Sequence, residues 1–194
     1  LRARYTATPS IEIVEGDALE TDWGRLAGGP YLLAGNLPYY ITTPLLFRIL
    51  ASPRPERAAL LVQREVAGRL VAAPGTGEYG ALSVNVQVSA RVELVARVGA
   101  GSFHPRPAVD SAIVLVTPLE DPLVHAGEEQ PFRRFVQAVF GLRRKQLVRV
   151  VRELSGLSAA EAQLVIGTLA LDPTTRPETL APRTFVRLFQ ALAR

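Results

Sequence analysis

The residues best suited to chemistry form one tetrapeptide, Asn36-Leu37-Pro38-Tyr39. Pro38 fixes its own φ and pushes Leu37 towards an extended conformation, so the backbone carbonyls of this turn have defined directions. Asn36 supplies a side-chain oxygen that accepts hydrogen bonds, and Tyr39 supplies a flat aromatic face. This set of groups suits a planar base that carries an exocyclic amine. The alternative is an ordinary Asn-x-Pro turn followed by a packed aromatic residue.

The turn closes an almost wholly apolar stretch over residues 31–36, which predicts a strand buried on both faces of a parallel sheet. In open α/β sheets, ligands bind at the carboxyl ends of the strands, where this turn lies. Apolar strands that alternate with helical patterns predict a doubly wound α/β sheet. The other elements expected here are strands at 11–17 and 58–62, a helix at 43–50 with Thr43 as its N-cap and Pro44 as its first residue, and a helix at 64–70.

The pattern changes beyond residue 90. Strands predicted at 92–98 and 112–116 have no helix between them, so we expect an antiparallel pair at the sheet edge. After an acidic linker that contains Pro and Gly, apolar residues recur at helical spacing, and Ser158 with Glu161 is typical of a helix N-terminal capping box. We therefore expect an α/β domain over residues 1–118, a linker over 119–130 and a helical domain over 131–194.

The composition excludes several classes of site. The sequence has no Cys and only two His residues, which excludes a disulfide framework, thiol catalysis and Cys-ligated zinc, so we expect no metal. A hydrophobic share of 48% with 21% charged residues is typical of a folded globular protein. No apolar run approaches the roughly 18 residues of a membrane-spanning helix. We therefore expect no membrane contact and a cytoplasmic location.

Several stretches, in order along the chain, resemble the landmarks of one enzyme family; they are residues 16–19, 36–44, 62–67, 74–84, 103–111 and 140–147. The sequence resembles the rRNA adenine N6-dimethyltransferases, in particular the branch of small-subunit 16S rRNA dimethyladenosine transferases, the kasugamycin-sensitivity methylases. Each stretch is weak by itself, but the ordered combination is highly specific. Tyr40 stands where the family usually has Asn, and we expect this change to be tolerated because its side chain follows the reactive turn.

The resemblance implies a Rossmann-like methyltransferase sheet, with S-adenosylmethionine (SAM) as the methyl donor and no metal. It implies that the Asn36 side chain and the Leu37 or Pro38 carbonyl accept hydrogen bonds from the adenine N6 amine. Tyr39 and Phe103 would stack on the two faces of the target base after it leaves its helical stack. Packing within a loop is the alternative role for Phe103.

On the cofactor side, the resemblance implies that Asp17 and the Ala18 N–H hold the adenine of SAM, and that Asn36 also borders the SAM site. Plain turn chemistry is the alternative for Asp17. The family's Gly-rich cofactor loop, ribose-binding acid and N-terminal substrate-gating segment have no counterpart in residues 1–194, and residues 1–5 read like the end of a helix. We therefore expect a polypeptide of residues 1–194 alone to bind SAM weakly and to lack methyltransferase activity.

Positive charge is concentrated in one part of a chain whose net charge is +4. Seven basic residues and no acid lie between positions 131 and 152, namely Arg133, Arg134, Arg143, Arg144, Lys145, Arg149 and Arg152. A solvated helix face is the ordinary interpretation, but uncompensated charges on an RNA enzyme favour phosphate contacts. The residues expected to bind RNA are Arg106, Arg143, Arg144, Lys145, Arg149 and Arg152.

The expected activity is dimethylation of the N6 amines of two adjacent adenosines near the 3′ end of 16S rRNA. The partner is 16S rRNA in the small ribosomal subunit or its precursor, and a monomer is expected. The main alternative is a ribosome-assembly or RNA-binding factor in which methylation is secondary or absent. A DNA adenine methyltransferase is less consistent with the sequence, because those enzymes favour Asn or Asp followed by Pro-Pro-Tyr and lack the helical tail. A macrolide-resistance methylase of large-subunit rRNA shares the turn, but the basic residues 143–145 and the stretch 74–84 favour the small-subunit branch.

Overall fold

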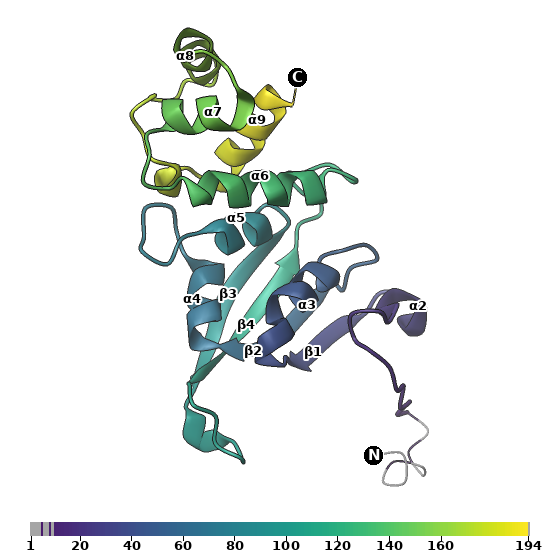
Figure 1. The fold of residues 1–194 in the computed structure, drawn as a ribbon. Coiled ribbons are helices and arrows are strands. Elements are labelled where there is room, and N and C mark those ends of the chain that lie inside the picture. The colour runs from purple at the N-terminus through teal and green to yellow at the C-terminus, as the bar shows by residue number, and fades with distance from the viewer. Residues whose placement is uncertain (1–4, 6–7, 9, 194) are drawn as a thin grey trace.

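A computed structural model describes residues 5, 8 and 10–193 of the chain (Figure 1). The first part contains α2 (Trp23–Ala27), β1 (Leu32–Asn36), the 3-10 turn η1 (Tyr39–Ile41), α3 (Thr42–Ile49), β2 (Arg57–Gln63), α4 (Arg64–Val71), α5 (Ala81–Gln87), β3 (Ala90–Val98), η2 (Ala100–Ser102) and β4 (Ser111–Pro118). The second part contains α6 (Glu129–Gly141), α7 (Leu147–Ser155), α8 (Ala159–Thr168), η3 (Pro177–Thr179) and α9 (Pro182–Leu192). Most of the helix end predicted at 1–5 lies outside the described residues.

The sheet has the strand order β1-β2-β4-β3. β1 and β2 are parallel and are joined through α3, whereas β4 is antiparallel to both β2 and β3. The antiparallel edge pair predicted beyond residue 90 is therefore confirmed. Apolar residues of β2 and β4 form a core with α3, α4 and α5, and alternate residues of β2 such as Arg57 and Ala59 are exposed. Among the described residues, helices thus cover one face of the sheet.

Two predictions about the first strands are wrong. Residues 11–17 form no strand, because no described strand offers them a hydrogen-bonded partner. β1 is the edge strand of the described sheet, and its residues are alternately exposed and half-buried, with Leu32 71% exposed, so the strand is not buried on both faces. An apolar composition identified the strand but could not show how many neighbours it has. Ile11 and Val14 are exposed as well.

The start of α3 also differs from the prediction. The helix begins at Thr42 with Ile41 as its N-cap, so Thr43 is not the cap and Pro44 is the third helical residue. The η1 turn runs directly into α3 and supplies this earlier start. Pro44 is still compatible with the helix, because N–H groups in the first helical turn have no partner within the helix.

The C-terminal helices lie at one end of the molecule, and the connection between β3 and β4 projects from the opposite end (Figure 1). The predicted capping box of α8 is confirmed, with Ser158 Oγ accepting from the Glu161 N–H and Glu161 accepting from the Ser158 N–H. Residues before the predicted linker share the core of this helical part. The buried Tyr79 hydroxyl, for example, donates to the Leu180 carbonyl at 2.8 Å. The division at 118 and 131 stays a prediction. No helix among the described residues is long and apolar enough to cross a bilayer.

Candidate active site

An open cleft of about 350 Å³ lies at the carboxyl end of β1. One wall is the turn Asn36–Tyr39, and the other comes from the β3–β4 connection at Phe103, His104, Pro105 and Pro107. The structure therefore brings together all five residues expected to act on the acceptor base, although Phe103 is far from the turn in sequence. A cleft bounded by a polar turn and an aromatic side chain can hold a flat base by its edge and its faces.

The turn is held by hydrogen bonds on both sides of Pro38. The Leu37 N–H donates to the Leu61 carbonyl of β2 at 3.1 Å, and the Leu37 side chain is buried in the sheet core. The Pro38 carbonyl accepts from the Ile41 N–H and from the Thr42 hydroxyl, both at 3.1 Å. Those two bonds use both lone pairs of the Pro38 oxygen.

The Leu37 carbonyl, in contrast, accepts no hydrogen bond from the described residues. Of the two carbonyls between which the sequence left the choice open, only that of Leu37 is therefore unengaged by the described residues. The Asn36 side chain is exposed and also has no hydrogen-bond partner among the described residues. Two unengaged acceptors, one from a side chain and one from the backbone, thus lie next to each other at the rim of the cleft.

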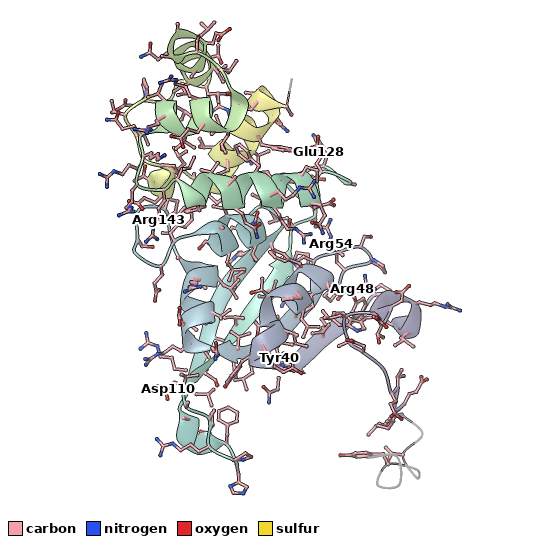
Figure 2. The ribbon with its side chains drawn as sticks, viewed as in Figure 1. Tyr40, Arg48, Arg54, Asp110, Glu128 and Arg143 are labelled. Carbon is pink, nitrogen blue, oxygen red and sulfur yellow. The ribbon has the colours of Figure 1, made fainter. Side chains whose placement is uncertain are left out.

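The aromatic residues of the cleft are both half-buried. The Tyr39 hydroxyl shares a hydrogen bond with Ser111 Oγ, and the two oxygens are 2.7 Å apart. Phe103 follows η2 in the β3–β4 connection. Tyr40 does not line the cleft and is 86% exposed, with its side chain on the surface near β1 (Figure 2). Its position agrees with the expectation that a residue other than Asn is tolerated there.

Sequence reasoning assigned His104 only a structural role, yet this residue lines the cleft. Pro105 and Pro107 were also not singled out as cleft residues. The available signal was their adjacency to Phe103, because three neighbours on one projecting loop are placed together. His104 is exposed and forms no hydrogen bond with the described residues.

Asp17 and Ala18 do not line this cleft. Both are exposed in a tight turn, where Asp17 Oδ1 accepts from the Leu19 N–H at 2.8 Å and the Asp17 carbonyl accepts from the Thr21 N–H at 2.9 Å. Asp17 Oδ2 has no partner among the described residues. Arg48 ties the turn to α3 by donating to the Thr21 carbonyl at 3.1 Å. Turn chemistry thus occupies one carboxylate oxygen of Asp17 and leaves the other available.

The prediction of seven uncompensated positive charges is wrong for two of them. Glu153 lies just beyond the acid-free stretch and accepts hydrogen bonds from Lys145 Nζ at 2.7 Å and from Arg149 Nε at 2.9 Å. Those two bonds hold the pKa of Glu153 below its usual range, so the carboxylate stays charged. One turn of α7 brings residues 149 and 153 together, because side chains four positions apart share a helix face.

Arg133 is also not a free cation. Its guanidinium lies 4.2 Å from the centre of the Phe47 ring, and burial lowers its pKa. This contact joins α6 to α3. The remaining basic residues of the stretch are exposed and form no ion pair with the described residues; they are Arg134, Arg143, Arg144 and Arg152. Arg106 is exposed on the β3–β4 connection. That connection projects from the end of the molecule opposite the C-terminal helices (Figure 1).

A second cavity lies where α3, α5 and α6 meet, and its lining includes Phe47, Asn85 and Arg133. Asn85 is 6% exposed, and its side-chain oxygen is buried without a hydrogen-bond partner among the described residues. The cavity includes none of the residues expected to act on the acceptor base or on the donor. The cleft at Asn36 is therefore the candidate active site.

The sequence matches the ribosomal RNA adenine dimethylase family over residues 1–194. It is 41% identical to the ribosomal RNA small subunit methyltransferase A of Geobacter sulfurreducens, over 99% of this chain and 72% of that protein. The Pseudomonas aeruginosa protein of the same name is 40% identical, over 100% of this chain and 71% of that protein.

Solved structures agree. A dimethyladenosine transferase from Plasmodium falciparum superposes with a TM-score of 0.80 at 25% identity, over 96% of this chain and 74% of that one. The 23S rRNA methyltransferase ErmE, at 24% identity, shares the fold with a TM-score of 0.69 over 100% of this chain and 76% of that one. The likeness confirms a Rossmann-like methyltransferase sheet followed by a helical part. The chain belongs to the ribosomal RNA adenine dimethylase family.

Proposed function

We propose that this protein uses SAM to dimethylate the N6 amines of two adjacent adenosines near the 3′ end of 16S rRNA, in the small ribosomal subunit or its precursor. The observation that carries the proposal is the cleft in which the Asn36–Tyr39 turn faces Phe103. The names of the bacterial relatives support the small subunit as the substrate particle. A cytoplasmic, monomeric enzyme is part of the same proposal.

The adenine amine needs help because its lone pair is delocalised into the ring. Asn36 Oδ1 and the Leu37 carbonyl each accept one N–H of the amine, which favours a tetrahedral N6 whose lone pair is no longer conjugated with the ring and points at the incoming methyl group. Both acceptors belong to one stiff turn, so little reorganisation is needed during the reaction. The N–C bond forms as the bond between the methyl carbon and sulfur breaks. The methylated amine then releases a proton to water at the open cleft.

Tyr39 and Phe103 hold the ring of the base. Extruding a base from its stack costs a few kcal/mol, and stacking on aromatic side chains returns about 1–3 kcal/mol per base. A base stacked between these two side chains is held on both faces, while the turn holds its edge. No described group is required as a general base, because a methylated adenine ammonium is strongly acidic.

The donor side fits SAM in part. The unengaged Asp17 Oδ2 can accept from the amine of the donor's adenine, and the exposed Ala18 N–H can donate to the neighbouring ring nitrogen. When bound, SAM supplies a methyl group made electrophilic by its sulfonium. Asn36 lines the acceptor cleft at the carboxyl end of β1, and the family resemblance implies that it also borders the SAM site.

The experiment that tests the proposal is transfer of labelled methyl groups from SAM by the full-length protein. Undermethylated 30S particles, 50S particles and duplex DNA are offered in parallel. We expect dimethyladenosine only in 16S rRNA. Label in 23S rRNA or in DNA alone would overturn the substrate assignment, and 30S binding without any transfer would favour an assembly factor.

The ion pairs of α7 refine which cations contact RNA. Changing Arg143 and Arg144 together to Gln should weaken 30S RNA binding and lower the salt dependence of log K by about 1.4–1.8, because each lost phosphate contact removes about 0.7–0.9. Glu153→Gln should strengthen RNA binding, because it frees Lys145 and Arg149 from their ion pairs.

Arg91→Gln is the matched control for both predictions, since Arg91 is exposed and pairs with Glu93 on β3. Filter binding at several salt concentrations measures the slopes; an unchanged slope in the double variant would move the RNA-binding surface elsewhere.

A further inference from the structure

We propose that Asp110 and Ser111 are positioning residues that set the two aromatic walls of the acceptor cleft against each other. Neither residue lines the cleft. The dipeptide lies where β4 begins. Ser111 bonds to Tyr39 of one wall, and Asp110 bonds to Ala100 in the η2 turn that leads to Phe103 of the other. The inference rests on the proposed function, because it concerns how the cleft holds a base for methyl transfer.

Ser111 controls the Tyr39 wall. Its side chain is fully buried, and its Oγ lies 2.7 Å from the Tyr39 hydroxyl oxygen. Tyr39 belongs to η1, a short turn with no buried residue, so packing alone does not fix the direction of its ring. The bond to Ser111 holds the far end of the ring, 72 residues away in sequence. A phenol held at its hydroxyl can pivot little about its side-chain torsions.

Asp110 controls the Phe103 wall. Its Oδ1 accepts from the Ala100 N–H at 3.1 Å, at the first residue of the η2 turn that leads to Phe103. The backbone of Asp110 is itself fixed, because its carbonyl accepts from the Arg64 N–H at the start of α4, at 3.0 Å. Figure 2 shows Asp110 at the base of the projecting connection that carries this wall.

The strand that begins at Ser111, β4, is hydrogen-bonded to a neighbouring strand on each side. Ser111 pairs with Gln63 of β2 on one side and with Val98 of β3 on the other. β2 also bonds the Leu37 N–H of the reactive turn through the Leu61 carbonyl. Both walls are therefore hydrogen-bonded to neighbouring positions at the same end of the sheet. Removing the side-chain hydrogen bond of either Asp110 or Ser111 should therefore loosen one wall of the cleft and leave SAM binding unaffected.

A double-mutant cycle tests the Ser111 contact in the full-length protein. Ser111→Ala and Tyr39→Phe should each lower kcat for methyl transfer to 30S particles about three- to tenfold, with Kd for SAM unchanged, because each removes one net hydrogen bond. The double variant should lose no more than either single variant. Ser111→Thr, which keeps the hydroxyl, should recover part of the loss. Multiplicative losses, or a Ser111→Ala enzyme with wild-type kcat, would overturn the inference.

Asp110 is tested by comparing two replacements. Asp110→Ala should lower kcat about three- to tenfold, whereas Asp110→Asn should retain more activity, because it keeps Oδ1 and loses only an exposed ion pair with Arg64. Ser83→Ala is the control for buried hydroxyl loss, outside the cleft. It removes the bond from the Ser83 hydroxyl to the Arg69 carbonyl of α4 and the bond from the Gly80 N–H that caps α5, and it should lower thermal stability without changing kcat. Equal activity of Asp110→Ala and wild type would remove Asp110 from the proposal. A wild-type protein that methylates no RNA would instead overturn the proposed function itself.

Discussion

An Asn36→Ala variant is expected to lose about 10²- to 10³-fold in kcat for methyl transfer, the loss typical when one oriented polar group that stabilises developing charge is removed. Asn36 is exposed at the rim of the cleft, and its side-chain amide bonds to no described neighbour. Its removal therefore leaves no buried group unpaired, and the fold should keep its stability. The loss should appear in single-turnover methylation of 30S particles, with melting temperature as the check on folding.

Asn36→Asp separates an acceptor role of the amide oxygen from a donor role of the amide N–H₂ group. The carboxylate keeps an oxygen where the amide oxygen was and loses only the amide donor. If the oxygen is what the amine needs, the Asp variant should retain far more activity than the Ala variant. Equal loss in both would mean that the N–H₂ group of Asn36, rather than its oxygen, is what matters. Isothermal titration with SAM would then show a matching loss of affinity.

Local sequence signals predicted much of the fold. The parallel unit at 32–63 and the antiparallel pair β3–β4 follow from runs of apolar residues, and the α8 cap follows from Ser158 and Glu161. Local signals do not show which strands pair with one another. Residues 11–17 have a strand-like composition, yet pairing depends on a partner supplied by another part of the chain. The short helix α5 was missed, because Val-rich segments of this length do not distinguish a helix from a strand.

The candidate site was predicted in its residues but not in its hydrogen bonds. Family resemblance paired the Asn36–Tyr39 turn with Phe103, and the cleft places them together. Which carbonyl is available depends on Thr42, whose hydroxyl occupies the Pro38 oxygen only because α3 begins there. Counting charges between 131 and 152 stopped one residue before Glu153, the acid that pairs with two of the cations. A residue near the end of the counted range can pair with a side chain four positions further along the helix, outside that range.

Tyr39→Ala and Phe103→Ala are expected to lower kcat/KM for 30S methylation by about 5- to 150-fold each, which corresponds to the loss of about 1–3 kcal/mol of base stacking. Both residues contact the acceptor base rather than the donor, so Kd for SAM should stay within about twofold of wild type. Tyr40→Ala is the matched control. It removes an adjacent aromatic ring that is 86% exposed and outside the cleft, and it should leave kcat/KM unchanged.

Base insertion can be followed apart from chemistry. An RNA that carries 2-aminopurine at the target adenosine becomes brighter when the base leaves its stack, and stacking on protein rings quenches it again. Wild-type protein should therefore give a quenched complex, and either Ala variant should give a brighter one, because the extruded base then stacks on only one ring. A variant that reduces kcat/KM, weakens SAM binding equally and leaves the quenching intact would place that ring on the donor side. Because Tyr39 and Phe103 stack on different faces of the base, neither ring can replace the other, and each single variant should show a large decrease in kcat/KM.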